Sequence, residues 1–277
     1  MAWNLRQKPH PHIRQMWLST AVILQNDQNF EEFRSAIRLL DGICAPLKLV
    51  IAGNHDFTMD KPMFKSKVAQ VHPPLDPELV KKEYGDCGEI KRLFDEAASS
   101  GIVLLDEGTH QFTLNNGASL TVYASPFTPS LGDWGFQYHP QRGHEFSIGN
   151  GVDVVITHGP PLGIMDFTSS RQRAGCPELF GAVARSRPRL HCFGHIHEGW
   201  GAKLITWRDE TKSKAKLQTL ENHHHNKGYV TSHCKGVANP VEWGTQTLFV
   251  NAAIEGVEDD YPLHLPWVVE KELPKAG

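Results

Sequence analysis

Residues 190–201 read LHCFGHIHEGWG. The first four residues form a short apolar run bounded by breakers, which is typical of a buried strand. Two histidines, His195 and His197, follow in a glycine-rich turn. Ligands gather at strand ends in open α/β sheets, because the chain there is exposed but still anchored by the sheet. The stretch therefore predicts a buried strand with a candidate site at its tip, although alone it is also compatible with a plain polar turn.

The same arrangement occurs at two earlier apolar runs. Residues 51–56 read IAGNHD and residues 156–161 read ITHGPP. Consecutive parallel strands joined by helices bring their carboxyl ends to one edge of a sheet, so Asn54, His55 and His158 are expected to lie near the two later histidines. Neutral imidazoles with an amide oxygen suit borderline divalent ions such as Zn²⁺, Mn²⁺ or Fe²⁺. Taken singly, each residue also has a structural alternative, such as a turn-forming asparagine.

Segments with helical and strand patterns alternate along the chain, which indicates an α/β fold. A helix is predicted over residues 29–41, with Asn29 as its N-cap and Gly42 at its end. Further helices are predicted at 77–84, 89–99 and 177–187. Strands are predicted at 48–52, 102–106, 111–114, 119–124, 152–157, 190–193 and 246–253, the third and fourth as a hairpin.

Composition sets the class of protein. The chain has 277 residues, 40% hydrophobic, with a net charge of −3, so it lacks the strong basic field that gathers nucleic acid polymers or anionic membranes. Five cysteines, without a C-x-x-C pair, indicate neither a disulfide framework nor a zinc ribbon. We expect a cytoplasmic protein with a small-molecule partner, no membrane contact and an oligomeric state that the sequence leaves open.

One apolar stretch imitates a secretory signal. Residues 16–24 read MWLSTAVIL and follow several basic residues. We interpret this stretch as a buried strand, because two hydroxyl residues interrupt it and no small-residue cleavage site follows. No run reaches the ~18 apolar residues that a membrane-spanning helix requires.

Two segments stand apart from the regular elements. Residues 125–151 form a long loop rich in glycine, proline and aromatics, which is typical of a functional loop. Residues 208–242 read as an exposed polar insertion, and the triplet at 223–225 inside it as surface histidines. We expect one domain over residues 1–277, in which 1–20 is an atypical N-terminal segment.

The motifs GNHD, THGPP and GHIH, in that order, resemble those of the calcineurin-like metallophosphoesterase superfamily. Within this superfamily, the chain most resembles the brain-239-like metallophosphoesterase-domain proteins. The resemblance lies in the stretches ITHGPPLGIMDF, RAGCPEL, PRLHCFGHIHEGWG and LFVNAA. The resemblance implies a four-layer αββα sandwich and hydrolysis of phosphomonoesters or phosphodiesters, cyclic nucleotides included. It also implies two metal ions ~3.5–4 Å apart that share a hydroxide.

The resemblance assigns roles by motif. Asn54, His158 and His195 correspond to ligands of the second metal, and His197 to a ligand of the first. His55 corresponds to the histidine that protonates the leaving oxygen, which suits a group whose proton is available near neutrality. Asp56 would orient that imidazole or cap the turn, and we favour the cap.

A further expectation concerns the aromatic residues of the long loop. Trp134, Phe136 and Tyr138 would wall a pocket for a base or aryl group, or would simply pack.

The amino-terminal part departs from the family pattern. The family's first strand ends in Asp-x-His and is followed by Gly-Asp, whose aspartate bridges the metals. Val22 and Ile23 stand where that Gly-Asp belongs, and no aspartate precedes Asp27. Without these acids the first metal should bind weakly or not at all, which leaves one or two ions of Mn²⁺, Fe²⁺ or Zn²⁺ per chain.

Two explanations account for the missing acids, and the sequence leaves both open. The N-terminal segment is a truncated or mis-spliced version of an active enzyme, with the first strand missing or altered, or the protein is an inactive relative that binds metal or nucleotide. His10 and His12 are weak substitutes for the missing ligands, because little chain precedes them.

Overall fold

The computed structural model describes residues 14–18, 29–86, 88–207, 217–219, 229–234, 236, 240–258, 261–271 and 273. Its helices are α1 (Phe30–Asp41), α2 (Lys61–Gln70), α3 (Pro77–Tyr84), α4 (Glu89–Ala97) and α5 (Pro177–Ser186), with short 3-10 turns η1 (Ala98–Ser100) and η2 (His197–Gly199). None of the helices in these ranges combines the length and hydropathy needed to cross a lipid bilayer. The predicted helices are therefore present, and α2 was not anticipated.

A seven-stranded sheet forms the main layer. Its strands, in spatial order, are β11 (Leu217–Thr219), β10 (Gly201–Thr206), β13 (Gln246–Asn251), β9 (Leu190–Phe193), β8 (Val154–Thr157), β5 (Ser119–Ser125) and β4 (Gly108–Thr113). The four strands from β13 to β5 run parallel, while β4, β10 and β11 pair antiparallel at the two sides. The predicted hairpin is the β4–β5 pair, and three predicted apolar runs are β8, β9 and β13.

Shorter sheets face this layer or flank it. The strands β2 (Lys48–Val50) and β3 (Ile102–Leu104) form a parallel pair, and β12 (Tyr229–Ser232), β16 (Trp267–Lys271) and β1 (Arg14–Leu18) form a three-stranded sheet. Two small pairs complete the strands: β6 (Thr128–Pro129) with β7 (Gln137–Tyr138), and β14 (Glu255–Glu258) with β15 (Tyr261–Leu263).

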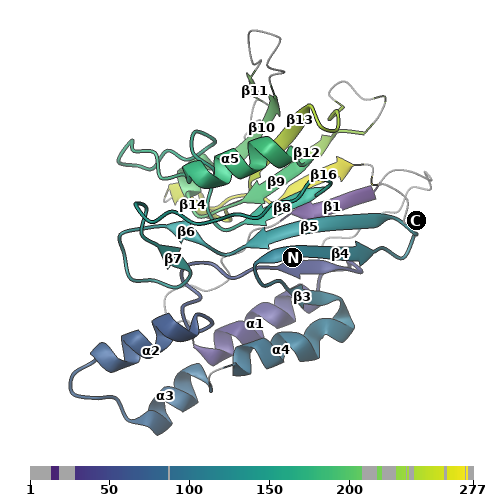
Figure 1. Cartoon of the computed structure of the whole chain (residues 1–277). Coiled ribbons are helices and arrows are strands. Elements are labelled where there is room, and N and C mark those ends of the chain that lie inside the picture. The colour runs from purple at the N-terminus through teal and green to yellow at the C-terminus, as the bar shows by residue number, and fades with distance from the viewer. Residues whose placement is uncertain are drawn as a thin grey trace.

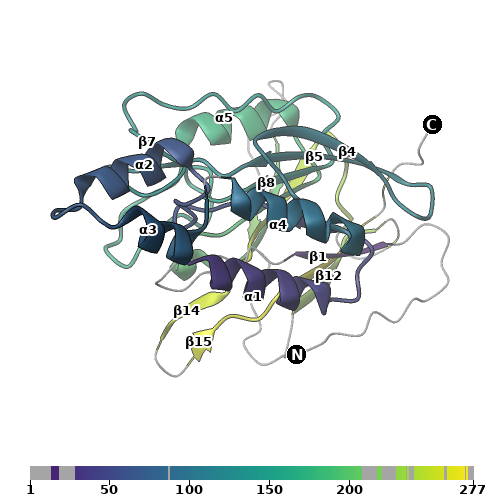
Figure 2. The ribbon, with the colours of Figure 1, turned by 90° about the horizontal axis from the view of Figure 1, so that it is seen from below.

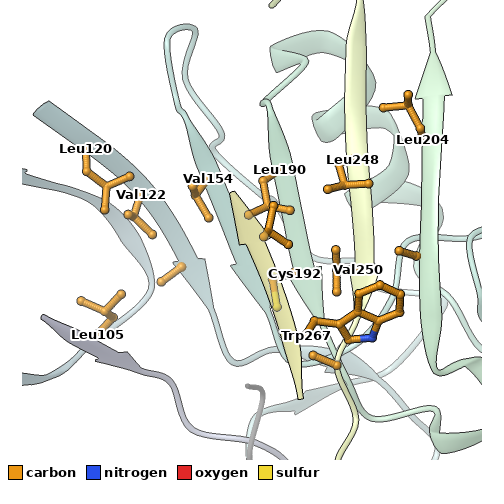
Figure 3. Close-up of a cluster of buried hydrophobic side chains, with 14 residues drawn as sticks. Leu105, Leu120, Val122, Val154, Leu190, Cys192, Leu204, Leu248, Val250 and Trp267 are labelled. Carbon is orange, nitrogen blue, oxygen red and sulfur yellow. The ribbon is translucent and has the colours of Figure 1, made fainter. Parts of the chain in front are cut away.

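Four layers follow from which side chains pack together. One face of the seven-stranded sheet packs on α5 through a cluster that includes Phe193, Phe249 and Leu179. The other face packs on β2, β3 and β16, where Trp267 is fully buried among Leu190, Val250 and their neighbours (Figure 3). The helices α1 and α4 cover the far side of β2 and β3 (Figures 1 and 2). This order of helix, sheet, sheet and helix is the predicted αββα sandwich.

The first helix shows how sequence signals become local structure. The Asn29 side chain accepts a hydrogen bond from the Glu32 backbone N–H at 3.0 Å, as an N-cap residue should. The backbone N–H of Gly42 closes the other end on the carbonyl oxygen of Arg38. Phe33 and Ala36 are the buried positions of α1, and Phe33 belongs to the cluster with α4 and β3. The predicted cap and its helix are therefore confirmed.

Two segments depart from the sequence expectations. The first described strand, β1, spans Arg14–Leu18 and pairs antiparallel with β16, so it only overlaps the start of the predicted 16–24 strand, whose remainder lies outside the described residues. The 208–242 segment is not exposed throughout, because β12 joins the three-stranded sheet and His233 and Cys234 are buried. The 223–225 triplet lies outside the described residues. The four described cysteines are free thiols.

Candidate active site

The three histidine-bearing turns converge at one end of the two facing sheets. The turn at 53–56 follows β2, the turn at 158–161 follows β8, and the turn at 194–197 follows β9. The expectation that all three strands share one parallel sheet is wrong, since β2 pairs with β3 in a separate sheet. The carboxyl ends of β2, β8 and β9 still meet, because the two sheets pack face to face.

Asn54 and His158 are in direct contact. The Oδ1 atom of Asn54 lies 2.6 Å from Nε2 of His158, and both side chains are buried. Gly53 makes this approach possible, because a Cβ atom there would come within 2.7 Å of the His158 ring. Gly53 is therefore required because a side chain there would clash with the His158 ring, and not because the turn needs a backbone conformation that favours glycine.

His195 completes the buried group. Its ring centroid lies 4.6 Å from that of His158, and its backbone has φ of 65°. A left-handed backbone is costly for a residue with a side chain and often marks a functional position. Asn251 supports this turn from β13, since its Nδ2 donates to the carbonyl oxygen of Ile196 at 2.8 Å. The strained turn and its fixed support direct His195 toward His158.

His197 lies at the more exposed side of the site. Its Nδ1 atom is 3.7 Å from Oε2 of Glu255, a residue of β14. Glu255 also raises the pKa of His55, although burial has the larger effect and lowers it. Glu255 therefore lies near His197 and affects the pKa of His55, and no sequence motif predicted its place in the site.

Burial keeps the inner imidazoles neutral. The pKa of His158 lies well below its usual value, first because the ring is buried and then because His195, His55 and His197 surround it. Burial, followed by His197 and His55, lowers the pKa of His195 to about 4, and Glu198 opposes the shift. At neutral pH both rings thus present uncharged nitrogens, the form in which histidine binds metals.

The turn that carries Asn54 and His55 is closed by Asp56. Oδ2 of Asp56 accepts the backbone N–H of Gly53 at 2.6 Å, so this aspartate caps the turn, as we expected. Burial raises the pKa of Asp56 to about 6. The backbone N–H of Gly135 donates to the Asn54 carbonyl oxygen at 2.9 Å and ties the long loop to the same turn.

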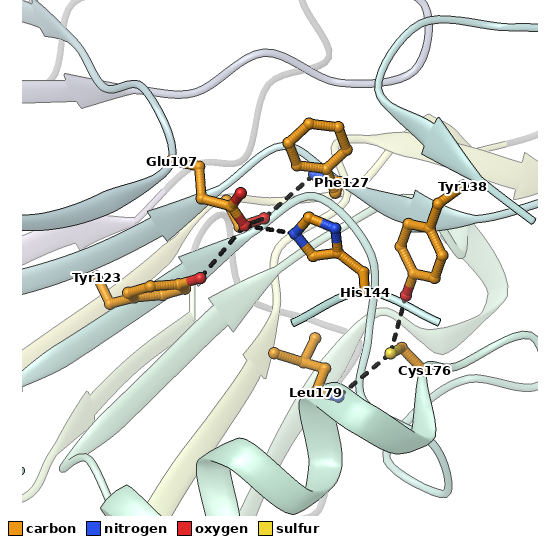
Figure 4. Close-up of polar contacts among 8 residues, drawn as sticks. Glu107, Tyr123, Phe127, Tyr138, His144, Cys176 and Leu179 are labelled. Carbon is orange, nitrogen blue, oxygen red and sulfur yellow. Dashed lines mark hydrogen bonds and ion pairs between the residues drawn. The ribbon is translucent and has the colours of Figure 1, made fainter. Parts of the chain in front are cut away.

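Only one of the three candidate aromatics lies beside the histidines. The ring of Trp134 is 4.9 Å from that of His55 and is partly exposed. Phe136 packs against Phe127 instead, and the hydroxyl of Tyr138 contacts the Cys176 thiol at 2.9 Å (Figure 4). The predicted aromatic wall therefore reduces to Trp134, while the other two rings pack deeper in the loop.

A buried histidine that the sequence did not single out supports the His158 turn. Nε2 of His191 lies 2.8 Å from the Thr157 hydroxyl, which itself donates to the carbonyl oxygen of Gly159. The hydroxyl proton is thus committed, so His191 must donate from Nε2. Burial lowers the pKa of His191 to about 3, which keeps the ring neutral. The signal in the sequence was its place in an apolar strand, where a histidine needs a partner.

The donor set can be compared with the needs of a metal ion. In the described residues, no three His, Cys, Asp or Glu side chains are grouped so that they could hold an ion. The converging atoms come from Asn54, His158 and His195, two neutral imidazoles and an amide oxygen. This set fits one borderline ion, whereas the carboxylate that would join two ions is absent from it.

Sequence comparison finds several relatives of this chain among known proteins. The human metallophosphoesterase domain-containing protein 1 is 36% identical over 162 residues, 56% of this chain and 45% of that protein. The Caenorhabditis elegans UPF0046 protein T07D4.2 is 36% identical over 175 residues, 59% of this chain and 41% of that protein. An Emericella nidulans protein named probable rhamnogalacturonate lyase C is 29% identical over 236 residues, 83% of this chain but 20% of that protein.

These matches cover less than half the length of each relative. The family model of the calcineurin-like phosphoesterases matches residues 26–199, which is more than half of the chain and contains all three histidine-bearing turns. The chain therefore belongs to the calcineurin-like phosphoesterase family.

Proposed function

We propose that this chain hydrolyses small phosphate esters, cyclic nucleotides among them, with the help of one divalent cation. The observation that carries the proposal is the contact of 2.6 Å between Asn54 and His158, with the His195 ring beside it. Two facing sheets bring Asn54 to the two histidines, although more than a hundred residues of chain separate Asn54 from either of them. Structural histidines alone would not need three separate strand ends to meet.

The residues present would hold a Mn²⁺, Fe²⁺ or Zn²⁺ ion through Asn54, His158 and His195. A bound divalent ion supplies a polarised phosphoryl group and a water of lowered pKa. Family members generally use two ions, but here His197 faces Glu255 at 3.7 Å, and among the described residues no bridging carboxylate joins the set. We therefore propose one tightly held ion, with the first site weak or unused.

His55 is the proposed general acid. It lies beside the metal-binding group on the same turn as Asn54, and it is less buried than His158. In the reaction, water adds to phosphorus and gives up one proton to the solvent, and the bond from phosphorus to the leaving oxygen breaks. His55 donates its proton to that oxygen and regains a proton from the solvent. Burial lowers the pKa of His55, and the negative charge of Glu255 opposes part of that shift.

Trp134 is the proposed contact for the leaving group of the substrate. The group that receives a proton from His55 must lie next to it, and the partly exposed ring of Trp134 is 4.9 Å away. Aromatic rings stack with an added attraction of about 0.5–1.5 kcal/mol. This neighbour favours substrates whose leaving group carries a base or an aryl ring.

The test combines turnover with metal content. Purified chain is loaded with Mn²⁺, assayed on bis-p-nitrophenyl phosphate and 2′,3′-cyclic nucleotides, and analysed for Mn, Fe and Zn. We expect the parent chain to turn over substrate, and His158→Ala and His55→Ala each to abolish turnover. Only His158→Ala should also lose the bound metal. His110→Ala is the matched control, because that histidine lies on β4, away from the site, and contacts the Asp106 carbonyl oxygen.

The same experiment separates the alternative. Stoichiometric metal without turnover would favour an inactive metal-binding relative, for which the missing carboxylates are the supporting observation. A folded protein that shows no bound metal and no turnover would contradict both the enzymatic and the metal-binding hypothesis.

A further inference from the structure

A carboxylate from outside the histidine motifs lies at the open side of the active site. Oε2 of Glu255 is 3.7 Å from Nδ1 of His197. Burial lowers the pKa of His55, and the negative charge of Glu255 opposes part of that shift, so the charge also acts at His55. The side chain of Glu255 is 58% exposed and that of His197 is 30% exposed. A phosphate ester that approaches the two histidines therefore meets this carboxylate.

The backbone on both sides of Glu255 is held in place. The strand β14 begins at Glu255 and pairs with β15, and the pair projects from the body of the molecule (Figure 2). β14 packs beside η2, the short turn that begins at His197. His264, just after β15, donates from its backbone N–H to the Ile254 carbonyl oxygen at 2.6 Å and from Nδ1 to that of Ala253 at 3.0 Å. The strand pair is therefore fixed at its base.

Trp200 joins this base to the turn that carries His197. Its ring stacks on His264 with centroids 5.2 Å apart and planes at 27°. Its Nε1 donates to the carbonyl oxygen of Leu265 at 3.2 Å, and its backbone N–H donates to that of His197 at 3.1 Å. One connected framework therefore sets the positions of Glu255 and His197.

The charges that act on the inner histidines come from other histidines and from an acid. After burial, the pKa of His158 is shifted by neighbouring histidines, and that of His195 by histidines and Glu198. Among the described residues, no lysine or arginine takes part in either shift. Glu198 is already engaged, because its carboxylate accepts the backbone N–H of Ser169. An extra negative charge on a substrate thus meets no cationic side chain at these two rings, and it faces Glu255 on the exposed side.

Phosphate esters differ in the charge that they bring to such a site. A diester carries one negative charge, whereas a monoester carries nearly two at neutral pH, because its second pKa is about 6. Repulsion from a fixed carboxylate is proportional to the charge of the ligand, so a monoester is repelled about twice as strongly. For a carboxylate that is largely open to water, each unit of ligand charge should change the affinity by about threefold.

We propose that Glu255 biases the active site toward phosphodiesters and against phosphomonoesters. This inference rests on the proposed hydrolysis of phosphate esters, because it concerns the same site, and it names the class of ester that the site favours. Glu255 determines specificity through its charge and does not touch the reacting atoms. A bound cation attracts both classes of ester, but it does so equally with and without a charge at residue 255.

Two closely matched ligands measure this bias without turnover. Phenylphosphonate carries two negative charges at pH 8, and its monomethyl ester carries one. Methoxide is too poor a leaving group to be lost during a titration. Each ligand is titrated calorimetrically into the full chain loaded with Mn²⁺. In Glu255→Gln we expect about threefold tighter binding of the methyl ester and about tenfold tighter binding of phenylphosphonate, so the ratio of the two affinities shifts by about threefold.

Three comparisons test whether the shift comes from the charge of Glu255. Glu96→Gln is the matched control, because it removes an equal charge from an exposed position of α4, on the far side of β2 and β3, and it should leave both affinities unchanged. In 1 M NaCl the shift in Glu255→Gln should shrink, since salt screens charges that are open to water. Glu255→Lys should move the ratio further in the same direction, and it decides the question if Glu255→Gln does not fold.

An unchanged affinity ratio in the Glu255 variants would overturn the proposal. An equal shift in Glu96→Gln, or a shift that stays the same in 1 M NaCl, would also overturn it.

The binding experiment separates this inference from the proposed hydrolysis. If the ratio shifts as expected but the parent chain turns over no ester, the hydrolysis alone is contradicted. If the parent turns over esters but the ratio does not respond to residue 255, the role of Glu255 alone is contradicted. Absence of binding of both ligands to the chain loaded with Mn²⁺ would contradict both.

Discussion

Gly53 lies directly against the imidazole of His158, so close that a Cβ atom on Gly53 would come within 2.7 Å of Cε1 and 2.8 Å of Nδ1. The ring can contact Asn54 only because residue 53 has no side chain. The glycine of one strand end therefore sets the position of a histidine from another sheet.

Gly53→Ala should displace His158 without unfolding the protein. Because the added methyl pushes the ring away from Asn54, we expect Mn²⁺ affinity to fall by about 10-fold to 100-fold, as it does when residues that position metal ligands are changed. Titration of Mn²⁺ followed by calorimetry measures this. Gly149→Ala is the control, since nothing lies within 4 Å of a Cβ atom there. Equal affinities in the two variants would contradict the steric account.

His195 should carry a backbone cost that glycine relieves. Its φ of 65° lies in the left-handed region, where a side chain costs about 1–2 kcal/mol. His195→Gly should therefore be more stable than His195→Ala by about 1 kcal/mol in urea unfolding, although both variants lose the imidazole and bind metal poorly. If the two variants unfold at the same urea concentration, the turn is not strained.

His191 should make the fold sensitive to acid. Burial holds its pKa at about 3 in the folded protein, whereas the unfolded chain has the ordinary value of about 6.5. Below pH 6.5 the unfolded chain binds a proton that the folded protein excludes, so stability falls as the pH drops, by about 1.4 kcal/mol per pH unit.

The measurement is urea unfolding at pH 7.5 and pH 5.5. His191→Gln retains an amide near the Thr157 hydroxyl but does not titrate, so its loss of stability between the two pH values should be smaller than that of the parent by about 1 kcal/mol. Burial also lowers the pKa values of His158 and His195. Both histidines are present in the parent and in the variant, so their effect on stability is the same in both proteins. If the parent and His191→Gln lose the same free energy of unfolding between the two pH values, His191 is protonated in the folded state.

Asn29 should stabilise α1 through its cap. Its Oδ1 accepts the Glu32 N–H at 3.0 Å, and loss of such a cap costs about 1 kcal/mol. Asn29→Ala should lower the free energy of unfolding by that amount, while Asn29→Ser should leave it nearly unchanged. A serine variant as unstable as the alanine variant would mean that the cap hydrogen bond contributes nothing.

Trp134 should matter for aromatic leaving groups alone. Trp134→Leu is expected to raise KM for phenyl phosphate by about 3-fold to 10-fold, the equivalent of one aromatic stacking contact, and to leave KM for glycerol 2-phosphate unchanged. Leu131→Ala, in the same loop and 81% exposed, is the control and should change neither. Equal increases for both substrates would assign Trp134 to loop packing.

Local sequence signals determined most of the regular elements. The spacing of Phe33 and its neighbours with the Asn29 cap defined α1, and short apolar runs defined β8, β9 and β13. These signals are local, because a cap acts within one turn and a buried strand is apolar along its own length. The sequence motifs also identified the family, because the glycine-flanked histidines occur in a fixed order along the chain.

What only the tertiary structure decided is which of these turns face one another and which further residues join them. The patterns suggested a single parallel sheet, but β2 lies in a second sheet, and the packing of the two apolar faces brings Asn54 to His158. Glu255 reaches His197 from a strand pair without a motif, and Trp134 lies by His55 while Phe136 does not. Side-chain convergence depends on how whole layers pack, and no window of sequence contains that information.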